Sequence, residues 1–245
     1  MKNEGKKEKY RADQLLVEQS LSETREQAQR LIMAGKVRRP GGQRVEKPSS
    51  NVSPDEDLYV VADSPFVSRA AYKLKEALDK YLCPFPPGAI VLDIGASTGG
   101  FTDLVLQRGA KRVYAVDVGY GQLHWRLRQD ERVVTVERVN ARYLSEEHVP
   151  EAVDIITADV SFIALQKVLE PASFFLKAGG WCLCLVKPQF QAKPSEVKRG
   201  GVVRDEEVKD RCVEEVTTFA EMELGWERIG TVASPVTGPA GNQEY

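Results

Sequence analysis

The sequence predicts an α/β protein with a doubly wound parallel sheet in its larger part and a small α+β domain before it. Beyond residue 67, strand-like apolar runs alternate with helical patterns, which is typical of a parallel sheet covered by helices on both faces. Within this part, the run 90–94 leads through a turn of small residues into a helix, and such turns line the ligand crevice of open sheets. Residues 10–62 instead combine short helical patterns with short strand-like pieces, which indicates a separate unit.

The small domain is expected to begin with two helices. A capping box of Thr24 and Gln27 opens the second helix, and Gly35 ends it. Pro40–Gly42 then forms a turn between two strand-like pieces. The expected elements are helix 12–19, helix 24–34, strands 37–39 and 43–45, loop 48–54 and strand 58–61, which gives domains at 1–62 and 67–245 and a linker at 63–66.

The same kinds of pattern predict the helices and strands of the larger domain. Apolar residues three and four apart predict helices, and short runs rich in Val, Ile and Leu predict strands. Residues 181–186 are almost continuously apolar, as a strand buried on both faces requires. The expected elements are helix 68–80, strand 90–94, helix 99–108, strand 111–117, strand 133–136, strand 153–158, helix 164–176, strand 180–187, helix 205–223 and strand 228–234.

Composition and length place the 245-residue chain among soluble globular proteins. No apolar run reaches the roughly 18 residues of a membrane span, and the Lys-rich residues 1–11 lack the apolar core of a signal peptide. The four cysteines have no metal-ligand spacing and there are only two histidines, so we expect no metal. The predicted location is the cytoplasm, away from membranes, with reduced structural thiols at Cys83, Cys182, Cys184 and Cys212.

Charge is unevenly distributed along the chain. Residues 1–50 carry 12 Lys and Arg against 7 Asp and Glu, whereas the remaining residues carry 22 against 29. A basic segment on an acidic body suggests a module that binds a polyanion. A solvated charged surface would give the same counts, so charge alone does not decide between the two.

The segment Ile90–Thr102 is the most informative part of the sequence. Its turn lets the backbone approach a ligand closely, and the following helix offers free N–H groups. Asp93 near the end of this strand and Asp117 at the end of the next could hold a nucleoside. Ser97 stands where a dinucleotide fingerprint requires Gly, and the Gly-Lys-Ser/Thr of a P-loop is absent. These features favour S-adenosylmethionine, which has no phosphate chain, over a turn that binds nothing.

Further polar residues lie where open parallel sheets keep their active sites. Asp159 follows the strand 153–158, and Lys187 ends the strand 180–187. The chemically promising segments are Ser68–Leu74, Ala158–Phe162, Val186–Phe190 and Gly238–Tyr245.

An ordered run of apolar, basic and Gly positions marks the small domain. Its members are Arg11, Asp13, Leu15, Leu16, Thr24, Arg25, Ala28, Leu31, Ile32, Gly35 and Val37. The run resembles the S-four type RNA-binding domain, named for a small-subunit ribosomal protein. The resemblance implies that basic side chains position RNA through its phosphates, namely Arg25, Arg30, Lys36, Arg38, Arg39 and Arg44.

The larger domain resembles the Rossmann-like, S-adenosylmethionine-dependent ribose 2′-O-methyltransferases of the FtsJ type. With the small domain included, the chain resembles the TlyA or haemolysin A family, which methylates cytidine ribose in ribosomal RNA. That resemblance implies ribosomal RNA or ribosomal subunits as partners and a catalytic tetrad of Lys73, Asp159, Lys187 and Glu244. The implied cofactor-binding residues are Asp93, Gly95, Ser97, Thr98, Gly99, Phe101 and Asp117, with Asn140 or Asp159 beside the nucleoside.

The implied chemistry fits these residue types. A ribose hydroxyl is a poor nucleophile, so the enzyme must align it with the methyl donor and remove a proton. A lysine can take that proton if burial and a second cation nearby favour its neutral form, and we expect Lys187 to be that base beside Lys73. Asp159 would orient Lys187, and Glu244 would position Lys73 or the ribose. Because Glu244 lies one residue from the end of the sequence, we expect either that the chain is truncated or that Glu244 is loosely held.

Other functions stay open at this point. The methyl group could go to a base, to transfer RNA or to protein, although the Lys-Asp-Lys set argues against a base. The haemolysin name suggests a cytolysin, and a third alternative is an RNA-binding assembly factor with a vestigial cofactor site. The nucleotide, the ribosomal subunit and the oligomeric state do not follow from the sequence.

Overall fold

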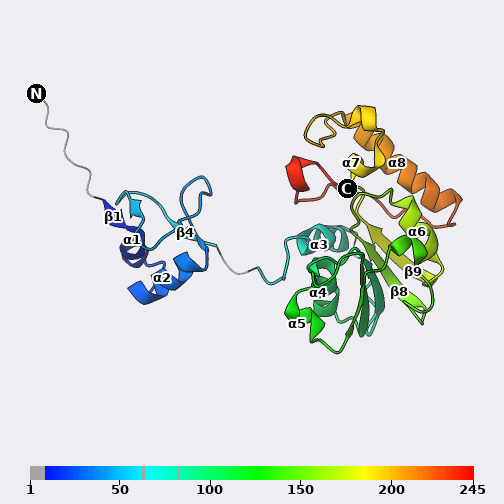
Figure 1. Ribbon diagram of the computed structural model, residues 1–245, viewed down its shortest axis with the longest axis horizontal. Coiled ribbons are helices and arrows are strands. Elements are labelled where there is room, and N and C mark those ends of the chain that lie inside the picture. The colour runs from blue at the N-terminus through cyan, green and yellow to red at the C-terminus, as the bar shows by residue number, and fades with distance from the viewer. Residues whose placement is uncertain (1–8, 62–63, 82) are drawn as a thin grey trace, which may run out of the picture. The chain divides into compact units, whose positions relative to one another are not determined.

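The computed structural model describes residues 9–61, 64–81 and 83–245, and contacts divide the chain into two compact units on either side of residue 63. Each unit is considered by itself. The expected α/β architecture is confirmed, with a parallel sheet in the larger unit (Figure 1). Two predicted features fall partly outside the described residues: the Lys-rich amino terminus, at residues 1–8, and the linker, at Asp63.

The small unit packs two helices against two short antiparallel strand pairs. The Thr24 hydroxyl caps the second helix by accepting a hydrogen bond from the Gln27 N–H at 3.2 Å, as the capping box predicts. Gly35 follows with φ of +70°, the left-handed conformation that ends many helices. The elements are β1 (Tyr10–Arg11), α1 (Ala12–Glu18), α2 (Arg25–Met33), β2 (Val37–Arg38), β3 (Asn51–Val52) and β4 (Tyr59–Val60), with β1 paired to β3 and β2 to β4.

Two expectations for the small unit are wrong. Residues 43–45 form no strand, and only an isolated bridge joins Arg44 to Arg38. The pairing with residues 43–45 is limited to two backbone hydrogen bonds, from the Arg39 N–H to the Gln43 carbonyl at 2.8 Å and from the Val45 N–H to the Val37 carbonyl at 3.0 Å, while β2 forms its ladder with β4. The expected loop 48–54 contains β3, because β1 supplies a partner strand that the sequence pattern did not reveal.

The larger unit is built on a five-stranded, fully parallel sheet with the order β7-β6-β5-β8-β9. The most apolar strands occupy the middle, where they are buried on both faces. The strands are β5 (Ile90–Ile94), β6 (Arg112–Asp117), β7 (Val133–Glu137), β8 (Val153–Ala158) and β9 (Leu176–Cys184).

Helices cover both faces of this sheet (Figure 1). Alternate residues of β5 point to opposite faces, so Val91 joins the core under α3 and α4 whereas Leu92 joins the core under α6 and α8. The same alternation places Asp93 on the Val91 side. The helices are α3 (Ala71–Lys80), α4 (Gly100–Gln107), α5 (Trp125–Arg128), α6 (Gln166–Ser173), α7 (Pro188–Gln191) and α8 (Glu206–Met222).

The last expected strand, 228–234, does not form. Tyr81 packs against Gly230, and its hydroxyl donates a hydrogen bond to the Thr231 carbonyl at 2.6 Å, so a side chain takes the place of a strand neighbour. The strand expected at 180–187 starts earlier and ends at Cys184. Beyond it, Val186 exchanges backbone hydrogen bonds with Tyr245, at 2.7 and 3.0 Å. The helices expected at 68–80 and 164–176 are shorter, at Ala71–Lys80 and Gln166–Ser173.

Among the described residues, no helix combines the length and apolar character needed to cross a membrane.

Candidate active site

A cleft of about 160 Å³ opens at the carboxyl ends of β5 and β8. This is the edge of the sheet where a ligand crevice is expected. The first turn of α4 and the segment before α3 close it from one side, and Lys187 lies at its base. The lining residues are Ser68, Ala70, Gly95, Ala96, Ser97, Thr98, Gly100, Phe101, Asp159, Ser161 and Lys187.

The turn between β5 and α4 depends on two glycines. Gly95 has φ of +80°, and a Cβ there would lie 2.5 Å from the Asp159 carbonyl oxygen. Gly99 has φ of +95°, and its Cβ would lie 2.2 Å from Leu127 of α5. Conformation and close packing therefore both require glycine at these positions. As a result, the backbone of the turn lies directly against the strand that carries Asp159.

Asp93 was predicted to contact the cofactor, but its side chain does not line the cleft. It is 1% exposed and accepts hydrogen bonds from the Thr102 hydroxyl at 2.5 Å and the Thr157 hydroxyl at 2.8 Å. Burial raises the pKa of Asp93 to about 6, although both hydrogen bonds act in the opposite direction. The carboxyl group therefore fastens α4 to β8 beneath the turn. The sequence could not show this, because the same Asp position also suits a ligand contact.

Asp117 ends β6, and its carboxylate holds the backbone of two loops. One oxygen accepts from the Ser97 N–H at 2.8 Å and the other from the Gly119 N–H at 2.7 Å. Each oxygen keeps a further lone pair that a ribose hydroxyl could use. Ser97 has φ of +49°, so this contact accompanies a strained residue at the cleft. Asn140 is exposed, and its side chain caps a short helical turn by accepting from the Arg142 N–H.

The four residues of the predicted tetrad converge from four elements. Lys73 of α3 places its Nζ 2.6 Å from Glu244 Oε2 and 3.7 Å from Asp159 Oδ2. Lys187, which follows β9, places its Nζ 2.5 Å from Asp159 Oδ1 and donates to the Ser161 hydroxyl at 2.9 Å. Two lysines therefore share one carboxylate, and both are about nine-tenths buried.

The contact between Lys187 and Asp159 Oδ1 is an ion pair without the alignment of a hydrogen bond, so this buried oxygen has no hydrogen-bond donor. The oxygen can accept from a group that enters the cleft, because a buried acceptor without a donor is costly.

Glu244 is not loosely held, contrary to the expectation from its position in the sequence. Its side chain is 1% exposed and receives hydrogen bonds from Lys73 and from the Gln189 amide at 3.3 Å. Its backbone carbonyl accepts from the Ser234 N–H at 2.8 Å, and the next residue pairs with Val186. Contacts with three segments therefore fix the residue, and none of them is visible in sequence spacing.

Three residues near the tetrad lie in segments that the sequence marks as promising, but the sequence predicts no role for them. Ser161 contacts Lys187, and Gln189 contacts Glu244 while its own amide oxygen is buried without a partner. Phe162 is 90% exposed with φ of +62°, and its ring lies 4.8 Å from that of Phe190. An exposed aromatic residue in a strained conformation is a signal for function, although it becomes visible only in a structure.

The six basic residues predicted to bind RNA differ in their contacts within the small unit. Arg25 lies 3.3 Å from the buried Asp13, and Arg39 pairs with Glu56 at 3.0 Å, so both also stabilise the fold. Arg38 donates to the Gly35 carbonyl, and Lys36 has a partner of its own. Arg30 and Arg44 are exposed; Arg44 lies 4.0 Å from Glu46, and Arg30 has no side-chain partner among the described residues.

The Asp13 carboxylate joins the first residues of the small unit to α2. Arg11 donates two hydrogen bonds to it, both at 2.9 Å, and Gln29 donates a third at 2.9 Å. The Arg11 guanidinium holds the pKa of Asp13 well below its usual range. The network ties α1 to α2 and holds the side chains of Arg11 and Arg25.

Comparison with known proteins covers both units. The FtsJ-like methyltransferase family matches residues 66–245, and the S4 domain family matches residues 11–58. The chain is 47% identical over 237 residues to the 16S/23S rRNA (cytidine-2′-O)-methyltransferase TlyA of Mycobacterium tuberculosis, with 96% of this chain and 87% of that protein covered. It is 35% identical over 236 residues to hemolysin A of Brachyspira hyodysenteriae, with 96% and 97% covered. The solved structure of a hemolysin candidate from Streptococcus thermophilus has a TM-score of 0.73 and 41% identity, over 97% of this chain and 86% of that one.

Proposed function

Because the chain belongs to the FtsJ-like methyltransferase family, we propose that it transfers a methyl group from S-adenosylmethionine to a ribose 2′-hydroxyl of cytidine in ribosomal RNA. The observation that carries the proposal is the contact among Lys73, Asp159, Lys187 and Glu244 at the end of the cleft. A vestigial enzyme would have no reason to keep four ionisable side chains buried together, because burying charge is costly.

The residues around the cleft fit the methyl donor. At Gly95 the cleft is lined by backbone without a side chain, and any side chain there would fill the space next to Asp159. Asp117 offers carboxylate lone pairs to ribose hydroxyls, and the backbone of Ser97 and Thr98 lines the opening. The volume of about 160 Å³ is below the ~300 Å³ of a small complete ligand pocket, so the donor would also extend outside the enclosed part. When bound, this donor supplies an electrophilic methyl group.

The tetrad then acts on the acceptor hydroxyl. When the ribose oxygen takes the methyl group from the sulfur of the donor, which leaves as a neutral thioether, the hydroxyl proton must also leave, and Lys187 is the base that we assign to it. Lys73 is held by two carboxylates, whereas Lys187 contacts one carboxylate and a neutral hydroxyl and lines the cleft, so Lys187 is the lysine that can reach the acceptor hydroxyl. Glu244 and Asp159 fix Lys73, and Lys73 in turn provides the second cation.

RNA recognition is assigned to two places. The small unit, which matches the S4 domain, contributes the basic side chains Arg25, Arg30, Lys36, Arg38, Arg39 and Arg44 for phosphate contacts. At the cleft, the exposed ring of Phe162 offers a stacking surface for the base of the nucleotide whose ribose is methylated. An activity on ribosomal RNA is expected in the cytoplasm.

Transfer of labelled methyl from S-adenosylmethionine to purified 16S and 23S ribosomal RNA tests this function. We expect incorporation into RNA and none into DNA of the same sequence, which lacks the 2′-hydroxyl. Equal incorporation into both would assign the methyl group to a base and contradict the proposal. Calorimetric titration of the donor alone provides an independent readout of cofactor binding.

A further inference from the structure

A basic turn, residues 193–204, projects from the larger unit after α7. It carries four cations, Lys193, Lys198, Arg199 and Arg204, and one acid, Glu196. The rest of this unit is acidic, since residues 64–192 and 205–245 together contain 18 Lys and Arg against 24 Asp and Glu. The turn is therefore a local concentration of positive charge on an acidic body.

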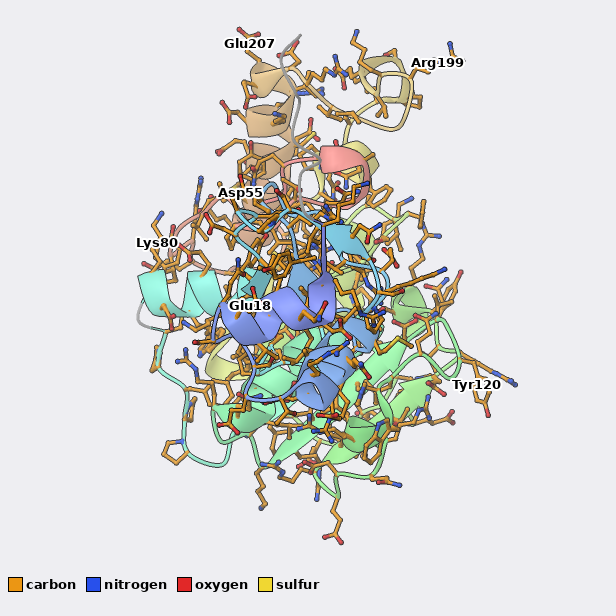
Figure 2. The ribbon with its side chains drawn as sticks, turned by 90° about the vertical axis from the view of Figure 1, so that its left-hand side faces the viewer. Glu18, Asp55, Lys80, Tyr120, Arg199 and Glu207 are labelled. Atoms are coloured by element: carbon orange, nitrogen blue, oxygen red, sulfur yellow. The ribbon has the colours of Figure 1, made fainter. Side chains whose placement is uncertain are left out.

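The charge of the basic turn is not neutralised from within. Glu196 is already engaged by Arg211 of α8 at 2.5 Å. Lys198, Arg199 and Arg204 are exposed, and their side chains have no ion pair or hydrogen bond among the described residues. Figure 2 shows Arg199 at the end of the turn, pointing away from the body of the unit. These three cations are available to an outside anion.

The tip of the basic turn is ordered by its backbone. The Lys198 N–H donates to the Val202 carbonyl and the Gly201 N–H donates to the Lys198 carbonyl, both at 2.9 Å. Gly200 and Gly201 have φ of +93° and +77°, and neither has a neighbour within 4 Å of a Cβ position, so conformation alone calls for glycine there. A bare, tight tip lets a bulky polyanion approach the flanking side chains.

A buried amide joins this turn to the catalytic segment. Asn242 is 3% exposed; its Nδ2 donates to the Gly201 carbonyl at 2.8 Å, and its Oδ1 accepts from the Val203 N–H at 3.0 Å. Asn242 is two residues from Glu244, which holds Lys73. The turn is thus fastened to the carboxyl-terminal segment that carries Glu244, and it is not a free surface loop.

From this juxtaposition we propose that the basic turn is a second RNA-binding surface, in which Lys198 and Arg199 contact phosphates beside the nucleotide that is methylated. Phosphate contacts position a nucleic acid without reading its sequence. A contact fastened to the segment of Glu244 sets the distance between the RNA backbone and the tetrad. The small unit would bring the RNA to the enzyme, and the turn would place the acceptor ribose.

This inference rests on the proposed function and adds a surface to it. Its test compares Lys198→Ala/Arg199→Ala with the wild type, using purified 23S ribosomal RNA as the probe. Both side chains are exposed, so folding and donor binding should be unchanged. Because each phosphate contact contributes about 0.7–0.9 to the salt slope, the slope of log K against log salt should fall by roughly 1.5, and affinity at low salt should fall about tenfold.

The matched control is Lys80→Ala/Lys111→Ala, which removes the same charge. Lys80 ends α3 and Lys111 precedes β6, so both lie away from the carboxyl ends of the strands, and both are exposed. We expect this variant to bind RNA nearly as the wild type does, and to keep the salt slope. Equal losses in both variants would show a general charge effect and overturn the inference.

Kinetics separate this inference from the proposed function. KM for RNA should rise in the Lys198→Ala/Arg199→Ala variant, while the affinity for S-adenosylmethionine, measured without RNA, stays that of the wild type. Unchanged affinity in a variant of an active enzyme would overturn the RNA-binding surface alone, whereas an inactive wild type would contradict the proposed function. Loss of binding to vesicles of anionic lipid with unchanged RNA affinity would assign the turn to a membrane and refute the inference.

Discussion

The two buried lysines of the active site differ in their surroundings. Lys73 lies against Glu244 and within 3.7 Å of Asp159, whereas Lys187 has Asp159 and the Ser161 hydroxyl. Of the two, only Lys187 is among the residues that line the cleft. The difference assigns the role of base to Lys187 and the role of supporting charge to Lys73.

Lys187→Arg tests this assignment at the residue scale. A guanidinium keeps the charge but cannot take a proton, so turnover should fall by roughly 10²–10⁴-fold, as is usual when a general base is removed. Lys187→Ala should lose as much, while both variants keep their affinity for donor and RNA. Single-turnover methylation measures the chemical step, and an active Lys187→Arg enzyme would mean that the lysine only positions the substrate.

Asp93 makes stability depend on pH in an unusual direction. Its pKa in the folded protein is about 6, above the ordinary value of 3.8, so the folded state binds more protons between these values. The contribution of this group to stability is therefore complete below about pH 4 and is lost as pH rises through 6, at a cost of about 3 kcal/mol.

The variant Asp93→Asn has no such cost. Its Tm relative to the wild type should rise between pH 4 and pH 7 by several degrees. Thermal unfolding at both pH values measures this. A Tm difference that stays constant with pH would show that ionising the buried Asp93 does not destabilise the fold.

At the scale of elements, the turn between β5 and α4 decides whether the cleft exists. The backbone of Gly95 lies so close to Asp159 that a single methyl group would push the two strand ends apart. The turn therefore sets the position of the donor and that of Asp159 at the same time.

Gly95→Ala should abolish donor binding in calorimetry, because the new Cβ would lie 2.5 Å from the Asp159 carbonyl oxygen and φ is +80°. Gly109→Ala is the matched control, since Gly109 also has a positive φ, +96°, but has nothing within 4 Å of its Cβ position. The control should lose some stability and keep donor affinity. Equal donor affinity in both variants would remove the turn from the binding site.

How far the sequence predicts these elements depends on where their partners come from. The bounds of β5 and β8 are those expected, because continuous apolar runs and a local turn mark them. The strand expected at 228–234 does not form, because the side chain of Tyr81, far away in the sequence, bonds to the Thr231 carbonyl where a neighbouring strand would pair. Asp93 and Glu244 show the same limit at the site: the residues were predicted, but burial and hydrogen bonds with distant segments give them their positions.

At the scale of the whole molecule, the chain combines a small unit, whose Lys and Arg all lie within residues 1–50, with a larger, acidic unit that carries the cleft. The larger unit is assigned the chemistry, and phosphate contacts are assigned to the small unit and to the basic turn. Phosphate contacts give affinity that depends on salt, while the cleft gives affinity for the donor that should depend on salt much less.

Arg30→Ala/Arg44→Ala tests this division. Both side chains are exposed, so the variant should keep its Tm and donor affinity, and its salt slope for 23S ribosomal RNA should fall by about 1.5. Arg25→Ala should instead lower the stability of the small unit, because it removes one of the side chains that contact the buried Asp13 carboxylate. RNA affinity that is unchanged in Arg30→Ala/Arg44→Ala would contradict the assignment of these residues.

The most direct measurement of the central claim is mass spectrometry of nucleosides from ribosomal RNA that has been incubated with the protein and S-adenosylmethionine. The account predicts 2′-O-methylcytidine in the reaction with the wild type and none with Lys187→Arg. A methyl group on a base, or the same amount of 2′-O-methylcytidine from both proteins, would contradict it.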